Sequence, residues 1–342
     1  MSKTILQVHR LTKQFDGKKS VFGFRKNGPI RVVTDISFEL REGETLSIVG
    51  ESGCGKTTLG RCIVRGIEAS SGEVVYYPEN GEPCDFLKLK GDAYNRYRQD
   101  IQMIFQDPYS SLSPRMSVFN IISEPLTATR KLSRSEIRER VTEIAEKTGL
   151  NASYLERYPH AFSGGQRQRI AIARALASRP RLIVCDEAVS ALDVSIQAQI
   201  INLLKDLQKQ YKITYIFISH DLSVVEHISD RVAVMHLGKI VELAPADSLF
   251  ANPGHPYTEA LLSAVPMPDP NFKKERIILE GEVPNPAKPP SGCHFHPRCP
   301  YKMDQCVTDE PAVREIGDQH YVACHYAGEL HLKGVNSYEK VE

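Results

Sequence analysis

The stretch Gly50-Glu-Ser-Gly-Cys-Gly-Lys-Thr57 fits the pattern G-x-x-x-x-G-K-[ST] of a phosphate-binding loop. An apolar run, Thr45–Val49, precedes it, and a helical pattern, Thr58–Arg65, follows it. Glycines let such a loop turn its backbone N–H groups toward phosphates, and the helix N-terminus adds positive charge. The flanking strand and helix argue against the alternative, a glycine-rich turn that matches by accident.

The loop therefore predicts a binding site for a nucleoside triphosphate. We expect Lys56 to reach the β- and γ-phosphates and the Thr57 hydroxyl to ligate Mg²⁺. The expected phosphate-binding residues are Gly50, Glu51, Ser52, Gly53, Cys54, Gly55, Lys56, Thr57 and Thr58.

Composition limits the class of protein. The chain has 342 residues, enough for two domains or for one large domain with an appendage. Lys and Arg number 43 against 42 Asp and Glu, so no net field attracts nucleic acid, and we expect no nucleic-acid partner. The sequence contains neither an apolar segment long enough to span a membrane nor the apolar region of a secretory signal. We expect a cytosolic chain, in which the eight cysteines do not form a disulfide framework.

Short apolar runs alternate with amphipathic stretches such as Gln166–Ala177 and Ile196–Tyr211. This alternation predicts an α/β fold with a largely parallel sheet that is covered on both faces. The expected strands are Ile36–Leu40, Thr45–Val49, Ile101–Phe105, Arg181–Cys185, Thr214–Ile218 and Val232–His236.

Two segments depart from this pattern. Residues 107–158 have few strand signals, and Ser133–Gly149 predicts a charged helix with Ser133 as N-cap and Glu136 three residues later. We expect a helical insertion there. From Pro245 onward prolines multiply, which argues against long helices and predicts a separate C-terminal module.

Two carboxylates, Asp186 and Glu187, end the apolar run that begins at Leu182. On a buried parallel strand Asp186 emerges at the carboxyl edge beside the phosphate loop, where it can hold Mg²⁺. Glu187 is then placed to orient or deprotonate an attacking water. The alternative is an acidic N-cap pair after a core strand, which the phosphate loop upstream disfavours.

A second helix start lies at Phe162-Ser163-Gly164-Gly165-Gln166-Arg167. Ser163 is a good N-cap, and the paired glycines expose backbone N–H groups at a positive helix end. One nucleotide hardly needs two such anion sites so far apart in the sequence. We therefore expect each nucleotide site to be completed by another protomer.

Taken together, these residues resemble the nucleotide-binding subunit of ATP-binding-cassette (ABC) transporters, over residues 5–245. Ser163–Gln166 is similar to the family's signature, and Gln106 is similar to its glutamine-loop residue. Ser190–Asp193 resembles the loop along the dimer seam, His220 the switch histidine, and Phe15 the aromatic residue that stacks on adenine. The resemblance implies a RecA-like core at 1–106 and 159–245, a helical subdomain at 107–158 and a Pro/Cys-rich extension at 246–342.

Simpler interpretations accompany these assignments. His220 would otherwise be an edge histidine, and Gln106 a polar residue at a strand end. Phe15 would otherwise be a core residue, with Phe22 and Phe24 as nearby candidates for the adenine contact. The chain also departs from the family's usual Glu-Pro-Thr-Ser, because Ala188 and Val189 follow Glu187, a change that we expect to loosen this turn.

The family resemblance also implies a mechanism and partners. Two ATPase subunits trap ATP between the phosphate loop of one and Ser163–Gln166 and Asp193 of the other. Thr57, Gln106 and Asp186 surround Mg²⁺, Glu187 positions water, and His220 steadies the γ-phosphate. The segment Asp107–Val118 transmits motion to two transmembrane permease subunits, so the chain is expected at the cytoplasmic face of the membrane as a peripheral subunit.

Four cysteines crowd the C-terminal segment: Cys293, Cys299, Cys306 and Cys324, with the spacing C-x5-C-x6-C-x17-C. Structural zinc sites usually show closer C-x2–4-C pairs. The wider spacing suits a four-cysteine iron–sulfur cluster at least as well, and unligated cysteines are the third alternative. His294, His296, His320 and His325 are candidates for substitute ligands, which we do not favour over the cysteines.

This extension resembles that of dipeptide/oligopeptide importer ATPases, most closely their second ATPase subunit. Some members of that family carry a 4Fe–4S cluster at this position, so the resemblance implies a structural cluster on the four cysteines. Such importers pair two related ATPases, which implies a heterodimer, with a homodimer as the alternative, and an extracytoplasmic solute-binding protein as an indirect partner. Alternative functions are a non-transport cassette ATPase in a soluble complex, a repair or translation ATPase, and an exporter; the cargo is not encoded here.

Overall fold

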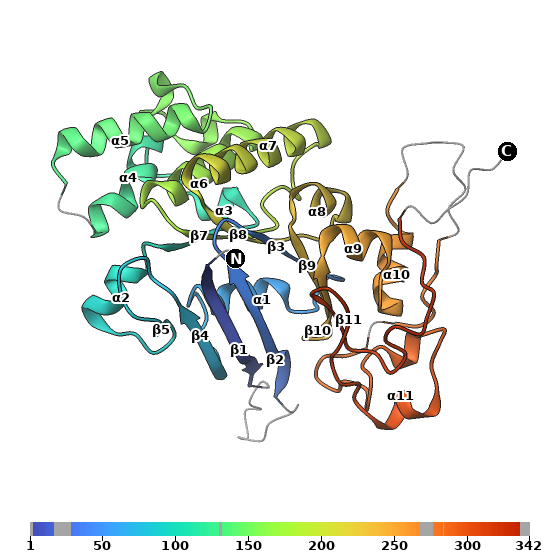
Figure 1. Cartoon of the computed structure of the whole chain (residues 1–342). Helices are drawn as coiled ribbons and strands as arrows, with labels where there is room; N and C mark the ends of the chain where they lie inside the picture. The colour runs from blue at the N-terminus through green and yellow to red at the C-terminus, as the bar shows by residue number, and fades with distance from the viewer. Residues whose placement is uncertain (1–2, 17–28, 130–131, 267–275, 283, 336–342) are drawn as a thin grey trace, which may run out of the picture. The chain divides into compact units, whose positions relative to one another are not determined.

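The computed structural model describes residues 3–16, 29–129, 132–266, 276–282 and 284–335 (Figure 1). Phe22 and Phe24 lie outside these residues. The strands are β1 (Thr4–Phe15), β2 (Ile30–Arg41), β3 (Thr45–Val49), β4 (Ser71–Tyr76), β5 (Cys84–Asp85), β6 (Ile101–Ile104), β7 (Leu182–Asp186), β8 (Thr214–Ile218), β9 (Arg231–His236), β10 (Lys239–Pro245), β11 (Arg314–Gly317) and β12 (His320–Val322).

The helices follow the same chain order. They are α1 (Lys56–Ile63), α2 (Gly91–Tyr97), α3 (Pro108–Ser111), α4 (Val118–Thr129), α5 (Arg134–Lys147), α6 (Gly164–Ala177), α7 (Val194–Tyr211), α8 (Leu222–Ile228), α9 (Ala246–Ala251), α10 (Pro256–Ser263) and α11 (Asp304–Thr308), with short 3₁₀ turns η1 (Ala152–Tyr154), η2 (Pro159–Ala161) and η3 (His296–Arg298). Within the described ranges, no helix has the length and apolar character needed to cross a membrane.

The chain divides into two compact units. The first comprises Met1–Gln7, Glu39–Thr45 and Val74–Ser219, and the second comprises Val8–Phe38, Leu46–Glu73 and His220–Glu342. Strands β1, β2 and β4, which form an antiparallel sheet with β5 in the order β2-β1-β4-β5, each have residues in both units. The domain limits derived from the sequence stay a prediction.

Three parallel strands, in the order β8-β7-β6, form the sheet of the first unit. Leu182 of β7 pairs with Ile101 of β6 on one side and with Thr214 of β8 on the other. Every residue of β7 and β8 is buried. Strands that are buried on both faces consist of continuous apolar runs, which is why the sequence predicts them correctly.

Helices α4, α5 and α6 pack against one another in the first unit (Figure 1). The described residues between 108 and 161 form helices and no strand. The predicted start of α5 is confirmed: the Glu136 N–H donates to the Ser133 hydroxyl at 3.3 Å, and the Ser133 N–H donates to the Glu136 carboxylate at 2.7 Å. This reciprocal pair satisfies two backbone donors that a helix end would otherwise leave open.

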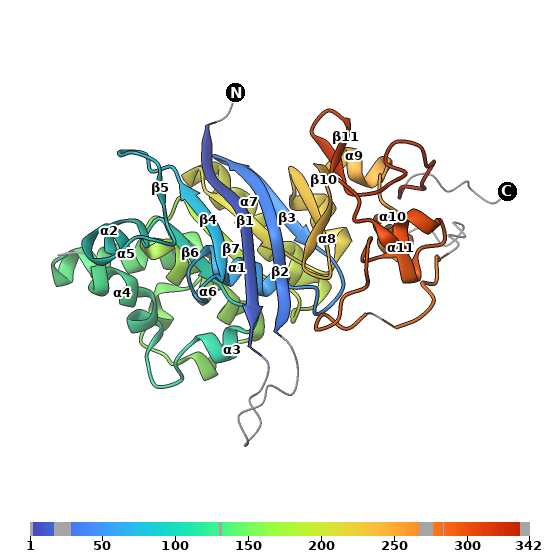
Figure 2. The ribbon, with the colours of Figure 1, turned by 90° about the horizontal axis from the view of Figure 1, so that it is seen from below.

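The sheet of the second unit has the order β11-β12-β10-β9-β3. β3 runs parallel to β9, with Val49 opposite Val234, and the other neighbours are antiparallel. The C-terminal region thus adds two strands that the sequence analysis missed. Its longest described helix, α10, has eight residues and begins with Pro256 at a position where the missing N–H costs nothing. In both views α10 and α11 lie beyond β10, on the side away from β3 (Figures 1 and 2).

One buried carboxylate connects these late elements. Glu242 of β10 is fully buried and accepts hydrogen bonds from the Gly254 N–H at 2.6 Å and the His255 N–H at 3.0 Å. The Thr258 hydroxyl also donates to it, and His320 Nε2 of β12 lies 2.7 Å away. A charge without water requires partners of this kind. Glu242 therefore fastens α10 and β12 to β10.

We predict that Glu242→Ala lowers the free energy of unfolding by about 3–5 kcal/mol, because it leaves several buried donors without an acceptor. Urea denaturation, monitored by circular dichroism, measures this free energy. Glu226→Ala, at an exposed position of α8, is the matched control and should stay within about 0.5 kcal/mol of wild type. Equal losses in the two variants would contradict the role given to Glu242.

Candidate functional site

The phosphate loop connects the end of β3 to the start of α1, and two of its glycines are required by close packing. A Cβ on Gly50 would lie 2.1 Å from the Met235 carbonyl oxygen, and a Cβ on Gly55 would lie 2.3 Å from that of Val32. Both glycines also have positive φ, 149° and 107°. No other residue fits these positions without moving the backbone.

Lys56 folds back across the loop. Its Nζ donates to the carbonyl oxygen of Gly50 at 2.7 Å and to that of Glu51 at 3.0 Å, and the residue is buried. The position of the ammonium therefore depends on the peptide groups of Gly50 and Glu51. Because Lys56 is also the first residue of α1, its charge lies at the positive end of that helix.

The predicted acidic pair lies at the carboxyl end of β7. Asp186 is the last residue of the strand and is fully buried. Glu187 follows with φ 46°, a left-handed conformation that is costly for a residue with a side chain. Its carboxylate accepts a hydrogen bond of 2.7 Å from Gln106 Nε2. The structure thus brings together two residues that the sequence places 81 positions apart.

The turn after Glu187 is well packed. Ala188 and Val189 are both 3% exposed. The Ser190 hydroxyl donates to the Glu187 carbonyl at 3.0 Å, and Gln197 of α7 donates to the Val189 carbonyl at 3.0 Å. The two residues that differ from the family's usual pattern are therefore buried within a hydrogen-bonded turn, and a looser turn stays a prediction.

Two helix N-termini lie side by side in the first unit. Ser163 caps α6 through a reciprocal pair with Gln166, and Asp193 caps α7 by accepting from the Ile196 N–H at 3.0 Å. A Cβ on Gly165 would lie only 2.6 Å from Ile196 Cγ2, so glycine allows the two helix ends to meet. Ser163, Gly164 and Gln166 are exposed. Two positive helix ends thus face solvent together.

The remaining predicted residues belong to the second unit, as the phosphate loop does. Phe15 ends β1 with 39% of its surface exposed, and Lys13 Nζ lies 4.9 Å from its ring centroid. Phe15 is therefore not a core residue, which removes the simpler interpretation. His220 is exposed and follows β8 by two residues.

The four C-terminal cysteines line one small pocket with a cavity volume of only about 10 Å³. Phe295, His296 and His325 also line it. Burial and the approach of the other thiols raise the pKa of Cys299 to about 12 and that of Cys324 to about 11. A metal binding there would have to displace protons from neutral thiols.

The geometry of the described residues does not support the prediction of an iron–sulfur cluster. In the described parts of the chain, no group of three or more His, Cys, Asp or Glu side chains has an arrangement that could hold a metal ion. The sequence shows that four thiols are present. Whether they can bind one cluster depends on how close their sulfur atoms lie, which the spacing does not show. Of the four histidines considered as substitutes, His320 instead contacts Glu242.

Two contacts of the phosphate loop were missed from the sequence. Arg298 forms a two-pronged ion pair with the Glu51 carboxylate, and the Tyr257 hydroxyl accepts from the Glu51 N–H. No sequence signal indicated either contact, since Arg298 lies 247 positions after Glu51. Burial lowers the pKa of His236, which packs on Tyr257, to about 4, so this imidazole is neutral at pH 7.

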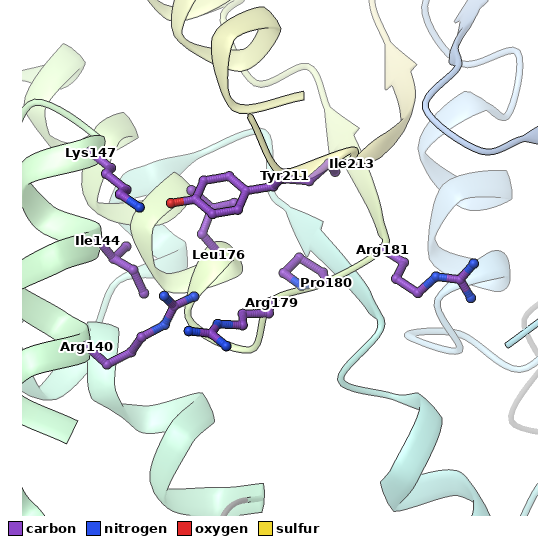
Figure 3. Close-up of a pocket in the computed structure, with 9 residues that line it drawn as sticks. All are labelled: Arg140, Ile144, Lys147, Leu176, Arg179, Pro180, Arg181, Tyr211 and Ile213. Atoms are coloured by element: carbon purple, nitrogen blue, oxygen red, sulfur yellow. The ribbon is translucent and has the colours of Figure 1, made fainter. Parts of the chain in front are cut away.

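A pocket elsewhere in the first unit has a different character (Figure 3). Arg140, Lys147 and Tyr211 line it, together with Arg181, the residue directly before β7. Arg140 and Lys147 both pair with the single carboxylate of Glu143, which compensates one of their two positive charges. Because Asp186 lies at the opposite end of β7, about 16 Å along the strand, this pocket is separate from the predicted acidic pair.

Comparison with known proteins agrees with this geometry. Residues 33–190 match the model of the ABC transporter family, and residues 241–306 match that of the oligopeptide/dipeptide transporter C-terminal region. The chain is 50% identical to the oligopeptide transport ATP-binding protein OppF of Escherichia coli, over 94% of this chain and 96% of that protein. It is 49% identical to the oligopeptide transport ATP-binding protein AppF of Bacillus subtilis, over 94% and 97%.

Solved structures show the same fold. The dimeric ATP-binding cassette MJ0796, bound to ADP and phosphate in a post-hydrolysis state, aligns with 71% of this chain and 99% of its own, with a TM-score of 0.61 and 28% identity. The two family matches cover the phosphate loop, Gln106, Ser163–Gln166 and the acidic pair on one side, and Cys293, Cys299 and Cys306 on the other. The chain is therefore an ATPase of the ABC transporter family, of the branch whose members carry the oligopeptide/dipeptide transporter C-terminal region.

Proposed function

We propose that this chain binds and hydrolyses ATP to drive an importer of peptides or similar solutes. The observation that carries the proposal is the contact between Gln106 and Glu187 directly after buried Asp186, in a chain that also has a closely packed phosphate loop. The names of its relatives, which are peptide and oligopeptide transport ATP-binding proteins, support the choice of solute.

In this proposal Lys56 and the N–H groups at the start of α1 bind the β- and γ-phosphates. Thr57, Gln106 and Asp186 offer the oxygen ligands that Mg²⁺ prefers, and the ion when bound neutralises charge on these phosphates. Glu187, oriented by Gln106, accepts a proton from the attacking water or aligns it. His220 donates toward the γ-phosphate as charge develops, and Phe15 offers its exposed ring to the adenine.

A second ATPase subunit completes the site. The adjacent N-termini of α6 and α7 present Ser163, Gly164, Gln166 and Asp193 toward solvent, with Gly165 half-buried between them. This surface suits the phosphates bound to a partner. The MJ0796 cassette is a dimer with bound ADP and phosphate, which supports this arrangement. We propose a related chain as the partner, with a second copy of this chain as the alternative.

Glu187→Gln should slow ATP hydrolysis by about 10²–10⁴-fold, because the amide cannot accept the proton of water. Binding of MgATP should be retained, since the phosphate loop is unchanged. Phosphate release and equilibrium binding of a fluorescent ATP analogue measure the two quantities. Glu226→Gln, at an exposed site of α8, serves as the control. Hydrolysis at the wild-type rate in Glu187→Gln would exclude Glu187 as the catalytic base.

The helical segment is proposed to contact two transmembrane permease subunits. Tyr109 of α3 is 67% exposed and its ring stacks on the buried Arg167, with the guanidinium carbon 3.8 Å from the ring centroid. A large exposed aromatic residue on a supported surface is typical of an interaction site. The peripheral position at the cytoplasmic face and the indirect solute-binding protein follow from this proposal.

We predict that Tyr109→Ala weakens co-purification with the permease subunits by about tenfold or more, as the loss of an interface aromatic does. ATP binding by the isolated chain should stay unchanged. Val313→Ala, at an exposed apolar residue outside the helical segment, is the control. If wild-type chain fails to co-purify with permeases and instead isolates with a soluble complex, the non-transport alternative replaces this proposal.

We also propose, on the family resemblance alone, that the four cysteines hold an iron–sulfur cluster. The described residues show no group arranged to hold a metal ion, so the thiols that line the pocket have to move toward one another to bind it. Anaerobically purified protein should contain about four iron and four sulfide per chain, and Cys299→Ser should lose them. Cys54→Ser, at a buried thiol of the phosphate loop, is the cysteine control for metal content. Zinc alone would identify a structural zinc module, and the absence of both metals would exclude a metal site.

A further inference from the structure

The C-terminal region holds the second residue of the phosphate loop at two points. Arg298 Nη1 and Nη2 donate to the two Glu51 carboxylate oxygens at 2.8 and 2.9 Å. The Glu51 N–H donates to the Tyr257 hydroxyl at 2.8 Å. Both the side chain and the backbone of Glu51 are therefore fixed by residues outside the part of the chain that matches the ABC transporter family model.

The two anchors are themselves held firmly. Tyr257 is fully buried, and its ring centroid lies 4.5 Å from that of His236 and 5.3 Å from that of Phe295. The Arg298 side chain is only 7% exposed and ends the short turn η3. A two-pronged pair between arginine and carboxylate fixes direction as well as distance, and partial burial strengthens it.

Glu51 in turn positions Lys56. The Lys56 ammonium donates to the Glu51 carbonyl at 3.0 Å and to the Gly50 carbonyl at 2.7 Å. Rotation of the Glu51 peptide would move an acceptor on which the lysine depends. Small displacements of a binding group reduce affinity or rate strongly, so the two anchors act on the nucleotide through this peptide.

Charge gives Arg298 a second role. Glu51 puts a carboxylate within a loop that receives the negative charges of a triphosphate. Because Arg298 pairs with both carboxylate oxygens, the local charge is balanced. A bare carboxylate would repel the phosphates, most strongly at low ionic strength, where the Debye length exceeds about 10 Å.

We propose that Arg298 and Tyr257 are positioning residues for nucleotide binding, so that the C-terminal region forms part of the ATP site. They act through Glu51, which fixes the peptide that holds Lys56. The proposal rests on the nucleotide role of the phosphate loop. The C-terminal region thereby determines ATP affinity. This role is separate from metal binding by the neighbouring cysteines.

The test compares steady-state hydrolysis and MgATP binding of the full chain with its partner subunit, in wild type and variants. Arg298→Ala should raise KM for MgATP by about 10- to 100-fold with little change in kcat. The rise should shrink as salt increases from about 50 to about 500 mM, because salt screens the exposed carboxylate. Tyr257→Phe, which loses only the acceptor for the Glu51 N–H, should raise KM by a few-fold.

The Glu51→Gln/Arg298→Ala double variant supplies the decisive comparison. Removing the carboxylate also removes the repulsion, so the double variant should bind MgATP more tightly than Arg298→Ala alone. Purely structural damage from the loss of Arg298 would persist in the double variant and would not depend on salt. Additive losses, or a KM in Arg298→Ala equal to that of wild type, would overturn the proposal.

Two controls keep the outcome interpretable. Arg314→Ala removes an exposed arginine of β11 in the same region and should leave KM unchanged. Melting temperature and metal content of each variant show whether the fold and the cysteine site are intact; if Arg298→Ala does not fold, Arg298→Lys, which cannot form the two-pronged pair, replaces it. Wild-type chain without ATP hydrolysis would contradict the proposed function itself, whereas changes limited to the variants concern this inference alone.

Discussion

Burial of the parallel strands on both faces is the constraint on which the molecule depends. β7 and β8 contain no exposed residue, and β3 is fully buried as well. Polar chemistry is therefore excluded from the strands and has to appear where they end. The phosphate loop follows β3, the acidic pair ends β7 and the histidine follows β8, so one physical rule accounts for the position of each motif.

The contacts at these strand ends share a second feature: polar groups are oriented by backbone atoms or by a neighbouring side chain. Carbonyl oxygens hold Lys56, a glutamine amide holds Glu187, and reciprocal capping holds the start of α6. Pre-arranged groups of this kind reduce the ordering that is needed when charge develops in phosphoryl transfer. The left-handed φ of Glu187 indicates that some local strain accompanies this arrangement.

The sequence predicted the parts of the fold that have local signals. Continuous apolar runs indicated β3 and β8 with their observed limits, and Ser133 with Glu136 indicated the start of α5. β12 was missed because it is only three residues long and joins β10, which is far away in the chain. β10 and β11 pair with the strands next to them in the sequence, β9 and β12, and were missed although their partners are local. The Arg298–Glu51 pair was also missed, because an ion pair between distant segments leaves no periodic pattern in the sequence.

These long-range contacts have a consequence for synthesis. His320 follows Glu242 by 78 residues, and Arg298 follows Glu51 by 247. At translation rates of about 5–20 residues per second, His320 is synthesised about 4–16 s after Glu242, and Arg298 about 12–50 s after the phosphate loop. A nascent chain therefore carries the complete nucleotide motif long before the loop acquires its final support. The first motif to leave the ribosome is among the last to reach its native surroundings.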